Sequence, residues 1–478
     1  MELVYDAPVT TPGRAKWAAI GIVVFCATLP LQWQSIVNVP GLGNLRYFHI
    51  GAIIMFALAH PSGKAIGKVV QAARPVFEAY IAFLLLSELT ALGWNADWSD
   101  YAQRSVYFVF GLWGGACVLV AVAHEVGRRI LFWASPLALV VFVLEFGQSM
   151  IAAGVNPVTT LEHALVSGDP TVIEFALFRR SFNSTAQSEE VRSNARHEIF
   201  GALIIVYCLS LAIGAVKRSS QIVLALSGLV TLVMLLISQS RSMMLAVALA
   251  LFIAFVRVVV TRRIKTGTLF LGALIIAATI VAVPTVGKLL ITRVTETKSY
   301  DARLGAFDLS SSEIAQRLTF GGGPLDTSTH NLVGDAALRG GVFTGLAAVI
   351  VVLGFTMYAV RNVRTYVMTG KARNFAALTC LSIVLVRCFT AGGGQLQQGE
   401  WFGFGLVLVI WLTRDGWESV LPPPPPPPLP PARRTPADRR EKATEPATRR
   451  VPAQRPAVPA RERPKVPARG RPPVPAFG

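Results

Sequence analysis

The chain has 478 residues, of which 53% are hydrophobic and only 15% are charged, with a mean hydropathy of +0.52 and a net charge of +18. Soluble domains carry about 25% charged residues, so this composition excludes an ordinary soluble enzyme and predicts a membrane protein. The charge is uneven, because residues 431–478 hold 13 basic and 4 acidic residues and residues 422–478 hold 19 of the 30 prolines.

The apolar stretches predict the fold class. About 20 helical residues cross the hydrocarbon core of a bilayer. By this measure the sequence predicts an all-α, polytopic membrane protein with about twelve transmembrane helices. The predicted spans are residues 17–35, 45–60, 75–94, 104–124, 130–154, 197–216, 220–238, 242–260, 268–287, 332–360, 374–392 and 401–413.

The connections between these spans alternate in charge. The basic set comprises residues 14–16, 64–74, 128–129, 217–218, 262–265 and 361–373. The short connections poor in Lys and Arg comprise residues 32–44, 95–103, 238–240 and 391–400. Short cytoplasmic loops carry the excess of Lys and Arg, so the alternation predicts that both termini are cytoplasmic.

Two of the outer connections are long, residues 155–196 and 288–330, and the second lies between spans 9 and 10. The charge rule does not apply to long loops, so their arginines do not contradict the topology. Loops of this length are usually functional or disordered. Within the first, Pro170–Phe182 is an amphipathic stretch that fits either a helix at headgroup level or a plain loop helix.

The C-terminal end of the chain differs from the rest. Residues 1–416 form the transmembrane domain, and residues 417–478 form a Pro/Arg-rich tail with seven consecutive prolines, Pro422–Pro428. This composition lacks apolar residues for a core, which predicts a disordered cytoplasmic tail. Its positive charge is expected to attract anionic lipids. Because no aromatic residues are interleaved with the charges, we do not expect it to bind nucleic acid.

Few residues at membrane depth can ionise. They are Glu78, Glu88, Glu145 and Arg387. We interpret them as a carboxylate–guanidinium contact between helices, with substrate contact or proton handling as the alternative. The five cysteines lie in apolar runs without a CxxC spacing, so we expect them to pack as small apolar residues. The sequence predicts no metal site and no cofactor.

Several cations gather on the predicted outer face. The hairpin 238–242, with the sequence SQSRS, puts Arg241 at the outer membrane interface. The loop 288–330 adds Lys288, Arg293, Lys298, Arg303 and Arg317, then a turn of Gly321, Gly322, Gly323 and Pro324, then Thr329, His330 and Asn331. Arginine grips phosphate oxygens bidentately, and glycine lets the backbone approach a ligand. Together these residues predict a receptor for a phosphorylated lipid, although each alone also fits a snorkelling cation, a flexible turn or an interfacial polar residue.

In this order, the residues resemble the bacterial O-antigen ligase and O-antigen polymerase superfamily. The resemblance covers residues 196–390: SQSRS at a span-to-span hairpin, a large outer loop with arginines, a glycine-rich turn, and His330-Asn331 leading into the next span. Ten residues separate His330 from Gly341, which matches the His-x10-Gly pattern of O-antigen polymerases. Residues 340–345 (GGVFTG) are similar to the family's glycine-punctuated helix start.

The resemblance implies a metal-independent glycosyltransferase of the bacterial inner membrane, which transfers glycan from undecaprenyl diphosphate to an acceptor on the periplasmic face. It implies His330, Arg241 and Arg303 as catalytic residues, with Arg293 as the alternative to Arg303. The residues expected to contact substrate are Arg241, Arg293, Arg303, Arg317, Gly322, Gly323, Asn331 and Gly341. The loop is shorter than in many relatives and its arginine–glycine spacing departs from the polymerase pattern. This leaves open which loop arginine takes part, and whether the protein is a ligase or a polymerase.

The chemistry of these side chains agrees with that activity. A lipid diphosphate leaves readily once its developing negative charge is met, and two arginines supply that stabilisation. The imidazole of His330 either accepts the proton of the acceptor hydroxyl or orients a substrate. The sequence has no Asp-x-Asp on the outer side, so we do not expect a metal-clamped diphosphate.

The expected partners are a polyprenyl diphosphate-linked glycan donor, a glycan or lipid acceptor and membrane lipids, and the oligomeric state is left open. Two alternatives remain. The first is a transporter or exporter of lipid-linked or polyanionic glycan, which would move its substrate without changing its covalent structure. The second is a structural or regulatory subunit scaffolded by the tail, whose role would be lost on deletion of residues 421–478.

Overall fold

The structure is a computed structural model of the chain. It describes residues 10–32, 35–39, 43–93, 99–152, 156, 158, 159, 162, 189–214, 218–238, 240–261, 311–322, 331–390 and 396–413. The chain divides into two units, Met1–Pro422 and Pro423–Gly478. The predicted span 268–287, the amphipathic stretch Pro170–Phe182 and the tail lie outside the described residues.

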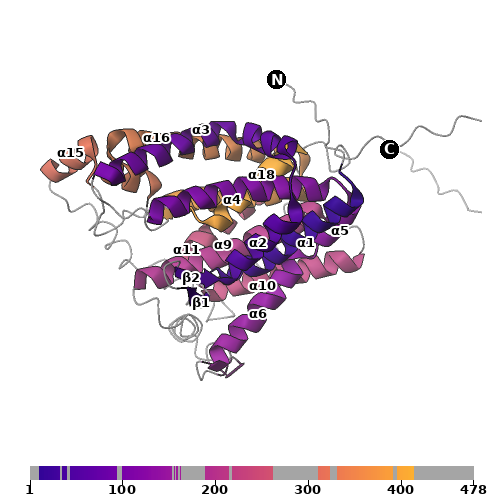
Figure 1. The fold of residues 1–478 in the computed structure, drawn as a ribbon. Coiled ribbons are helices and arrows are strands. Elements are labelled where there is room, and N and C mark those ends of the chain that lie inside the picture. The colour runs from indigo at the N-terminus through magenta and orange to yellow at the C-terminus, as the bar shows by residue number, and fades with distance from the viewer. Residues whose placement is uncertain are drawn as a thin grey trace, which may run out of the picture. The chain divides into compact units, whose positions relative to one another are not determined.

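Helices make up most of the described residues (Figure 1). They are α1 (Pro12–Thr28) with the 3-10 turn η1 (Leu29–Leu31), α2 (Tyr47–Ala59), α3 (Gly63–Gly93), α4 (Ser99–Val122), α5 (Glu125–Leu131), α6 (Ala134–Ala152), α9 (Glu189–Ile213), α10 (Arg218–Ser238), α11 (Arg241–Val260), α15 (Ser311–Phe320), α16 (Leu332–Thr369), α17 (Ala372–Thr390) and α18 (Gln398–Leu412).

Many of these helices can cross a membrane. In the described part of the chain, seven candidate spans are long and apolar enough to do so, and four shorter apolar helices accompany them. Each coincides with one of the predicted spans, although the boundaries differ. The helix content and the apolar helices confirm the prediction of an all-α membrane protein. The total of twelve spans stays a prediction.

The largest boundary differences concern basic residues. Helix α3 begins at Gly63 and α16 continues to Thr369, so both include residues that the sequence assigned to loops: Lys64, Lys68, Arg74, Arg361 and Arg364. Lys and Arg are good helix formers, and their long side chains can carry the charge to water from inside the helix. A basic residue therefore does not mark the end of a membrane helix.

A small antiparallel sheet departs from the all-α prediction. Strand β1 (Ser35–Val39) pairs with β2 (Gly43–Arg46) in the register Val39↔Gly43 to Ser35↔Arg46. The sequence signal for it is a run of β-branched residues followed by Pro40-Gly41, a pattern typical of a strand and a turn. The sheet is tied to the end of α1, because the Arg46 guanidinium donates to the Gln32 carbonyl at 3.4 Å.

Contacts between helices fix their directions. Helices α4 and α18 run parallel, because Gly111 approaches Trp401 and Gly115 approaches Gly405. Helix α16 is parallel to α18, since Phe355 packs on Trp401 and Tyr358 on Phe404. Helix α3 is antiparallel to α16, with Val76 against Gly354 and Thr90 against Gly340.

These directions define two ends of the helix bundle (Figure 1). We call them the α15 end, where α15 packs on the start of α16, and the α5 end, where α5 packs on the start of α1. The α15 end contains the starts of α4, α9, α11, α16 and α18 and the ends of α1, α3 and α17.

Arginines take part in many of the contacts at the α5 end. The Arg14 guanidinium donates to the His60 carbonyl, and the Arg373 guanidinium donates to the Thr413 carbonyl at 3.2 Å. Arg361 stacks over the Trp411 ring and Arg257 over the Tyr366 ring, at 4.4 and 5.6 Å from the ring centroids. These contacts join α1 to α2, α17 to α18, and the end of α16 to α11 and α18.

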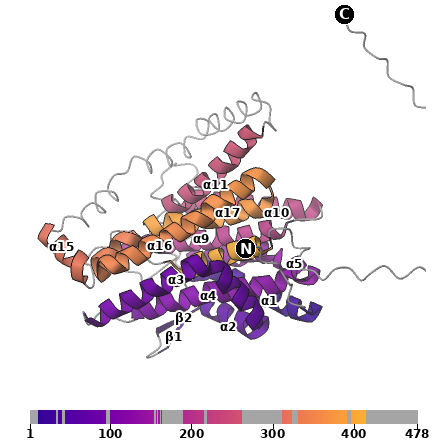
Figure 2. The same cartoon turned by 90° about the horizontal axis from the view of Figure 1, so that it is seen from above.

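Helix α18 is buried along nearly its whole length, and it contacts α4, α17, α9 and α3. Its ribbon, at the yellow end of the colour bar, runs among the other helices in Figures 1 and 2. The contact with α4 is close: a Cβ placed on Gly405 would lie 2.4 Å from the Gly111 carbonyl oxygen. Small residues allow membrane helices to approach in this way. The apolar core of the bundle therefore surrounds the last helix that the structure describes.

Candidate functional site

The structure places part of the predicted site at the α15 end. Arg241 is the first residue of α11, which starts at this end, and its side chain lies outside the described atoms. His330, Arg293, Arg303 and Gly323 also lie outside the described residues. Arg317, Gly322, Asn331 and Gly341 are described, and all four lie in or beside α15 and the first turns of α16.

The serines on either side of Arg241 share one partner. His197 Nδ1 lies 2.6 Å from the Ser240 hydroxyl and 2.8 Å from the Ser242 hydroxyl. Both serines are buried. Ser240 occupies the N-cap position of α11, yet its hydroxyl makes no capping hydrogen bond, although Ser is among the residues that cap helices best. The hairpin is thus held to α9 by side chains.

The residue after His197 belongs to a buried ionic cluster. The Arg387 guanidinium lies 3.5 Å from a Glu198 oxygen and 3.2 Å from a Glu400 oxygen, and all three side chains are at most 4% exposed. Glu400 also accepts from the backbone N–H of Gln397 at 2.8 Å, at the start of α18. The cluster therefore joins α9, α17 and α18 at the α15 end of the bundle.

This cluster revises one interpretation of the sequence. The expected carboxylate–guanidinium contact between helices exists, but the carboxylates are Glu198 and Glu400. Glu78 instead forms an exposed pair with Arg74 on its own helix, at 2.7 Å. Glu198 and Glu400 were missed because each lies at the edge of an apolar run, where the sequence resembles a loop. Their common signal is a carboxylate at the start of a predicted span: Glu198 is the second residue of span 197–216, and Glu400 directly precedes span 401–413.

Asn331 fixes the start of α16. It is the N-cap residue, and its side-chain oxygen accepts from the N–H groups of Val333 and Gly334 at 2.9 and 3.4 Å. An Asn in this position satisfies amides that have no partner within the helix. The structure therefore gives Asn331 a capping role, and His330 immediately precedes this capped helix in the sequence.

Arg317 lies in the last turn of α15, in the segment that was expected to be a loop. Its guanidinium donates to the Gly322 carbonyl at 3.2 Å. The Gly322 N–H in turn donates to the Leu338 carbonyl at 3.1 Å. The glycine turn after α15 is therefore attached both to α15 and to the first part of α16.

Two glycines with positive φ meet at this point. Gly321 has φ +75° and Gly341 has φ +80°, where α16 kinks. A Cβ on Gly341 would lie 3.1 Å from the Gly321 nitrogen, and a Cβ on Gly321 would lie 2.6 Å from the Arg339 carbonyl oxygen. Glycine is required here because two backbone segments approach each other. The expected contact of these glycines with a ligand stays a prediction.

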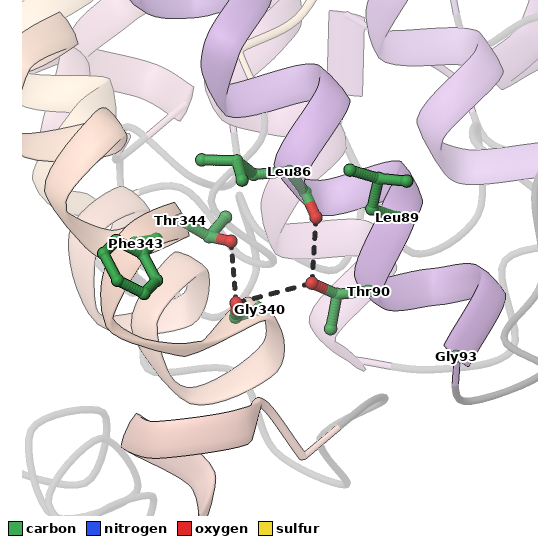
Figure 3. Close-up of a pocket in the computed structure, with 7 residues that line it drawn as sticks. All are labelled: Leu86, Leu89, Thr90, Gly93, Gly340, Phe343 and Thr344. Carbon is green, nitrogen blue, oxygen red and sulfur yellow. Dashed lines mark hydrogen bonds between the residues drawn. The ribbon is translucent and has the colours of Figure 1, made fainter.

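A surface cavity of about 470 Å³ lies beside the kink (Figure 3). Its lining comes from the end of α3 and from α16: Leu86, Leu89, Thr90, Gly93, Gly340, Phe343 and Thr344. The Thr90 hydroxyl donates to the Leu86 carbonyl at 2.8 Å and lies 3.4 Å from the Gly340 carbonyl, to which the Thr344 hydroxyl donates at 2.7 Å. Because these polar groups are paired within the wall, the cavity offers mainly apolar contacts.

Within the described ranges, no three His, Cys, Asp or Glu side chains gather where they could hold a metal ion. All five cysteines are buried and unpaired as disulfides, in agreement with their expected packing role. The arrangement at the α15 end thus combines cations, a capped helix start and an apolar cavity.

The sequence was also compared with known proteins. It matches no protein-family model and no curated protein.

Proposed function

We propose that this protein transfers glycan from a polyprenyl diphosphate carrier to an acceptor at the α15 end of its helix bundle. In this proposal the α15 end faces the periplasm, the α5 end faces the cytoplasm, and the protein spans the bacterial inner membrane twelve times. The activity is of the O-antigen ligase or polysaccharide polymerase type, and it needs no metal ion.

The orientation is supported by the arginines at the α5 end. Arg14, Arg257, Arg361 and Arg373 all make their contacts there, and cytoplasmic ends of membrane helices carry the excess of basic residues. Chemistry at the opposite end would then take place on the periplasmic face.

One observation carries the choice of substrate: two arginines and an apolar cavity occupy the same end of the bundle. Arg241 begins α11, and Arg317 contacts the glycine turn that packs on Thr90 and Gly340 of the cavity wall. A polyprenyl diphosphate has an anionic head and a hydrocarbon chain. We place the diphosphate head near the arginines and part of the hydrocarbon chain in the cavity, which would be open to lipid.

The transfer itself requires little beyond charge stabilisation. As the bond between sugar and diphosphate breaks, negative charge grows on the leaving phosphate oxygens, and Arg241 with a loop arginine would neutralise it. The start of α11 adds the partial positive charge of its unpaired N–H groups. His330 would take the proton from the acceptor hydroxyl or orient a substrate, and Asn331 would hold the start of α16 behind it.

The test uses purified full-length protein in liposomes with a lipid-linked glycan and an acceptor. We expect Arg241→Ala and His330→Ala each to lower kcat by about 10²–10³-fold, the usual loss when one group that stabilises the transition state is removed. The matched control is Arg129→Ala, which removes an exposed arginine paired with Glu125 on α5, and it should retain full transfer. Full transfer by both site variants would contradict the proposal.

The same liposomes distinguish the alternatives. A transporter or exporter would move the lipid-linked glycan across the bilayer and leave its covalent structure intact. In cells that lack the protein, uncapped lipid A core would indicate a ligase and single repeat units would indicate a polymerase. Mass analysis of the products therefore decides both the class of protein and the acceptor.

A further inference from the structure

The turn that carries Arg241 is fixed by a residue from another helix. His197 belongs to α9, and its Nδ1 lies within hydrogen-bond distance of the hydroxyls of Ser240 and Ser242. Arg241 is the residue between them. The contact is partly buried, since Ser240 is 1% and Ser242 is 5% exposed while His197 is half-buried. Moving the turn would break these contacts to two buried hydroxyls, which is costly.

Two contacts to one nitrogen restrict the turn more than one contact would. Ser240 is the N-cap of α11 and Ser242 is its second helical residue, so the two hydroxyls belong to residues on either side of Arg241. A single hydrogen bond would allow the first turn to rotate about that bond. Nδ1 carries one lone pair or one N–H, so the two hydroxyls share this site. The paired contacts, two residues apart, restrict both the position and the rotation of the backbone at Arg241.

The helix that supplies His197 is itself held firmly. Glu198 is paired with the buried Arg387 of α17, which also contacts Glu400 of α18. The next residues, Ile199 and Phe200, are buried in the core. Sites with a locked supporting layer keep their geometry better than sites on free loops. The anchor of the Arg241 turn is therefore a rigid point of the bundle.

We propose that His197 is a positioning residue, which holds the Arg241 turn in register with the substrate diphosphate through Nδ1. This inference rests on the function proposed above. The Nδ1 contacts of His197 are to Ser240 and Ser242, so the role assigned to it is that of a positioning residue and not of a catalytic one. Because a displacement of about 1 Å can lower a rate about 10²-fold, a loose turn would reduce kcat more than it changes KM.

The proposed role of His197 Nδ1 can be tested with side chains that place a polar atom at, or beyond, the position of this nitrogen. In His197→Asn the amide oxygen can take the place of Nδ1 and accept from both hydroxyls, whereas in His197→Gln the amide lies farther out, near the position of Nε2. A residue that only fills space would tolerate Gln at least as well as Asn. A residue that acts through Nδ1 is rescued by Asn and not by Gln.

The first readout is independent of activity: hydrogen exchange of the backbone amides in residues 238–246 of the full-length protein in detergent. We expect His197→Ala and His197→Gln to speed this exchange by about tenfold or more, as expected when a buried hydrogen bond is lost, and His197→Asn to remain close to the wild type. The control is His124→Ala, which removes another Nδ1 acceptor, the cap of α5 at the opposite end, and should leave residues 238–246 unchanged.

A second set of variants separates the contact from misfolding. Ser240→Ala combined with Ser242→Ala should loosen the same residues, and adding His197→Ala to this pair should have little further effect, because the contact is already gone. Additive effects of the three substitutions would contradict the proposed contact. So would unchanged exchange in His197→Ala.

The second readout is glycan transfer. We expect His197→Ala and His197→Gln to lower kcat by about 10- to 100-fold, with Asn restoring it to near the wild-type value. A turn that loosens while kcat stays unchanged would overturn the positioning role and leave the proposed function intact. Absence of transfer by the wild-type protein would overturn the proposed function, and with it the role of His197 in positioning Arg241 for transfer. The exchange data would still confirm or contradict the contact of His197 with Ser240 and Ser242.

Discussion

Arg387 carries one positive charge between two carboxylates in the interior of the protein. Its side chain is 1% exposed, and those of Glu198 and Glu400 are 4% and 2% exposed. Removing one partner of a buried ion pair leaves the other charge without compensation. The guanidinium is therefore expected to matter more for stability than any exposed arginine of the chain.

We predict that Arg387→Met lowers the free energy of unfolding by about 3–5 kcal/mol, because two carboxylates stay buried without a cation. Glu400→Gln should cost less, since these three groups together carry one excess negative charge. The control is Arg74→Met, whose exposed pair with Glu78 is worth at most about 1 kcal/mol. Detergent-denaturant titrations of the purified proteins measure these differences, and equal losses for Arg387→Met and Arg74→Met would refute the assignment.

Gly341 is predicted to tolerate no side chain. Its φ of +80° and ψ of 178° fall in a region that essentially only glycine adopts, and a Cβ would lie 3.1 Å from the Gly321 nitrogen, so Gly341→Ala should destabilise the protein by about 1–3 kcal/mol. Gly67→Ala is the matched control, because Gly67 lies inside α3 with no atom within 4 Å of its Cβ position. That change should stabilise by up to about 1 kcal/mol. Thermal unfolding midpoints that shift in the same direction would contradict the prediction.

The residue scale also shows what the sequence can and cannot specify. Arg387 could be recognised as an ionisable residue in a span, because that property belongs to a single position. Its partners could not, since Glu198 and Glu400 approach it only when α9, α17 and α18 pack together. His197 has no local pattern that distinguishes it from any polar residue before a span. Such contacts depend on tertiary structure.

At the scale of elements, glycines decide how closely α4 and α18 pack. A Cβ on Gly405 would lie 2.4 Å from the Gly111 carbonyl oxygen and 3.2 Å from the Gly115 Cα atom. Backbone atoms cannot move aside as the end of a side chain can. The two helices would have to separate to accept any larger residue.

We therefore predict that Gly405→Val destabilises the protein by about 3 kcal/mol or more, at or beyond the upper end of the usual range for overpacking. The fraction of monodisperse protein after detergent extraction, measured by size-exclusion chromatography, should fall sharply. Gly147→Val in α6 serves as the control, because no atom lies within 4 Å of that Cβ position. An equal yield for the two variants would show that the close contact is not required.

The elements themselves were largely predictable, and their exact ends were not. Apolar runs of membrane length identify spans because the bilayer sets their length. The same runs do not mark where a helix stops, so α3 and α16 extend into basic segments and α15 appears within a predicted loop. The β1–β2 sheet was missed because strands of four or five residues give too short a pattern beside a long apolar helix.

At the scale of the whole molecule, the proposed orientation can be read with cysteine labels. The five native cysteines are at most 1% exposed, so they leave little background for a maleimide reagent that cannot cross membranes. Val37 in β1 and Val126 in α5 are 50% and 37% exposed. In the proposed topology three spans separate these positions, which places them on opposite sides of the membrane.

We predict that Val37→Cys is labelled in spheroplasts, and that Val126→Cys is labelled only after the inner membrane is permeabilised. The reverse result would invert the orientation and place the α15 end in the cytoplasm. Labelling of both from one side would show that the number of spans between them is even. Either result would remove the argument for periplasmic chemistry.

The burial of α18 bears on how the chain is made. Its neighbours α4 and α3 are synthesised about 300 residues earlier, so the ribosome releases most of the other helices before the one they surround exists. The helices made earlier must therefore remain in the translocon or the lipid without α18, the helix around which they pack. A nascent chain truncated before residue 398 should therefore lack its final packing and be degraded by membrane proteases, which makes completion of translation the step that commits this protein to its native state.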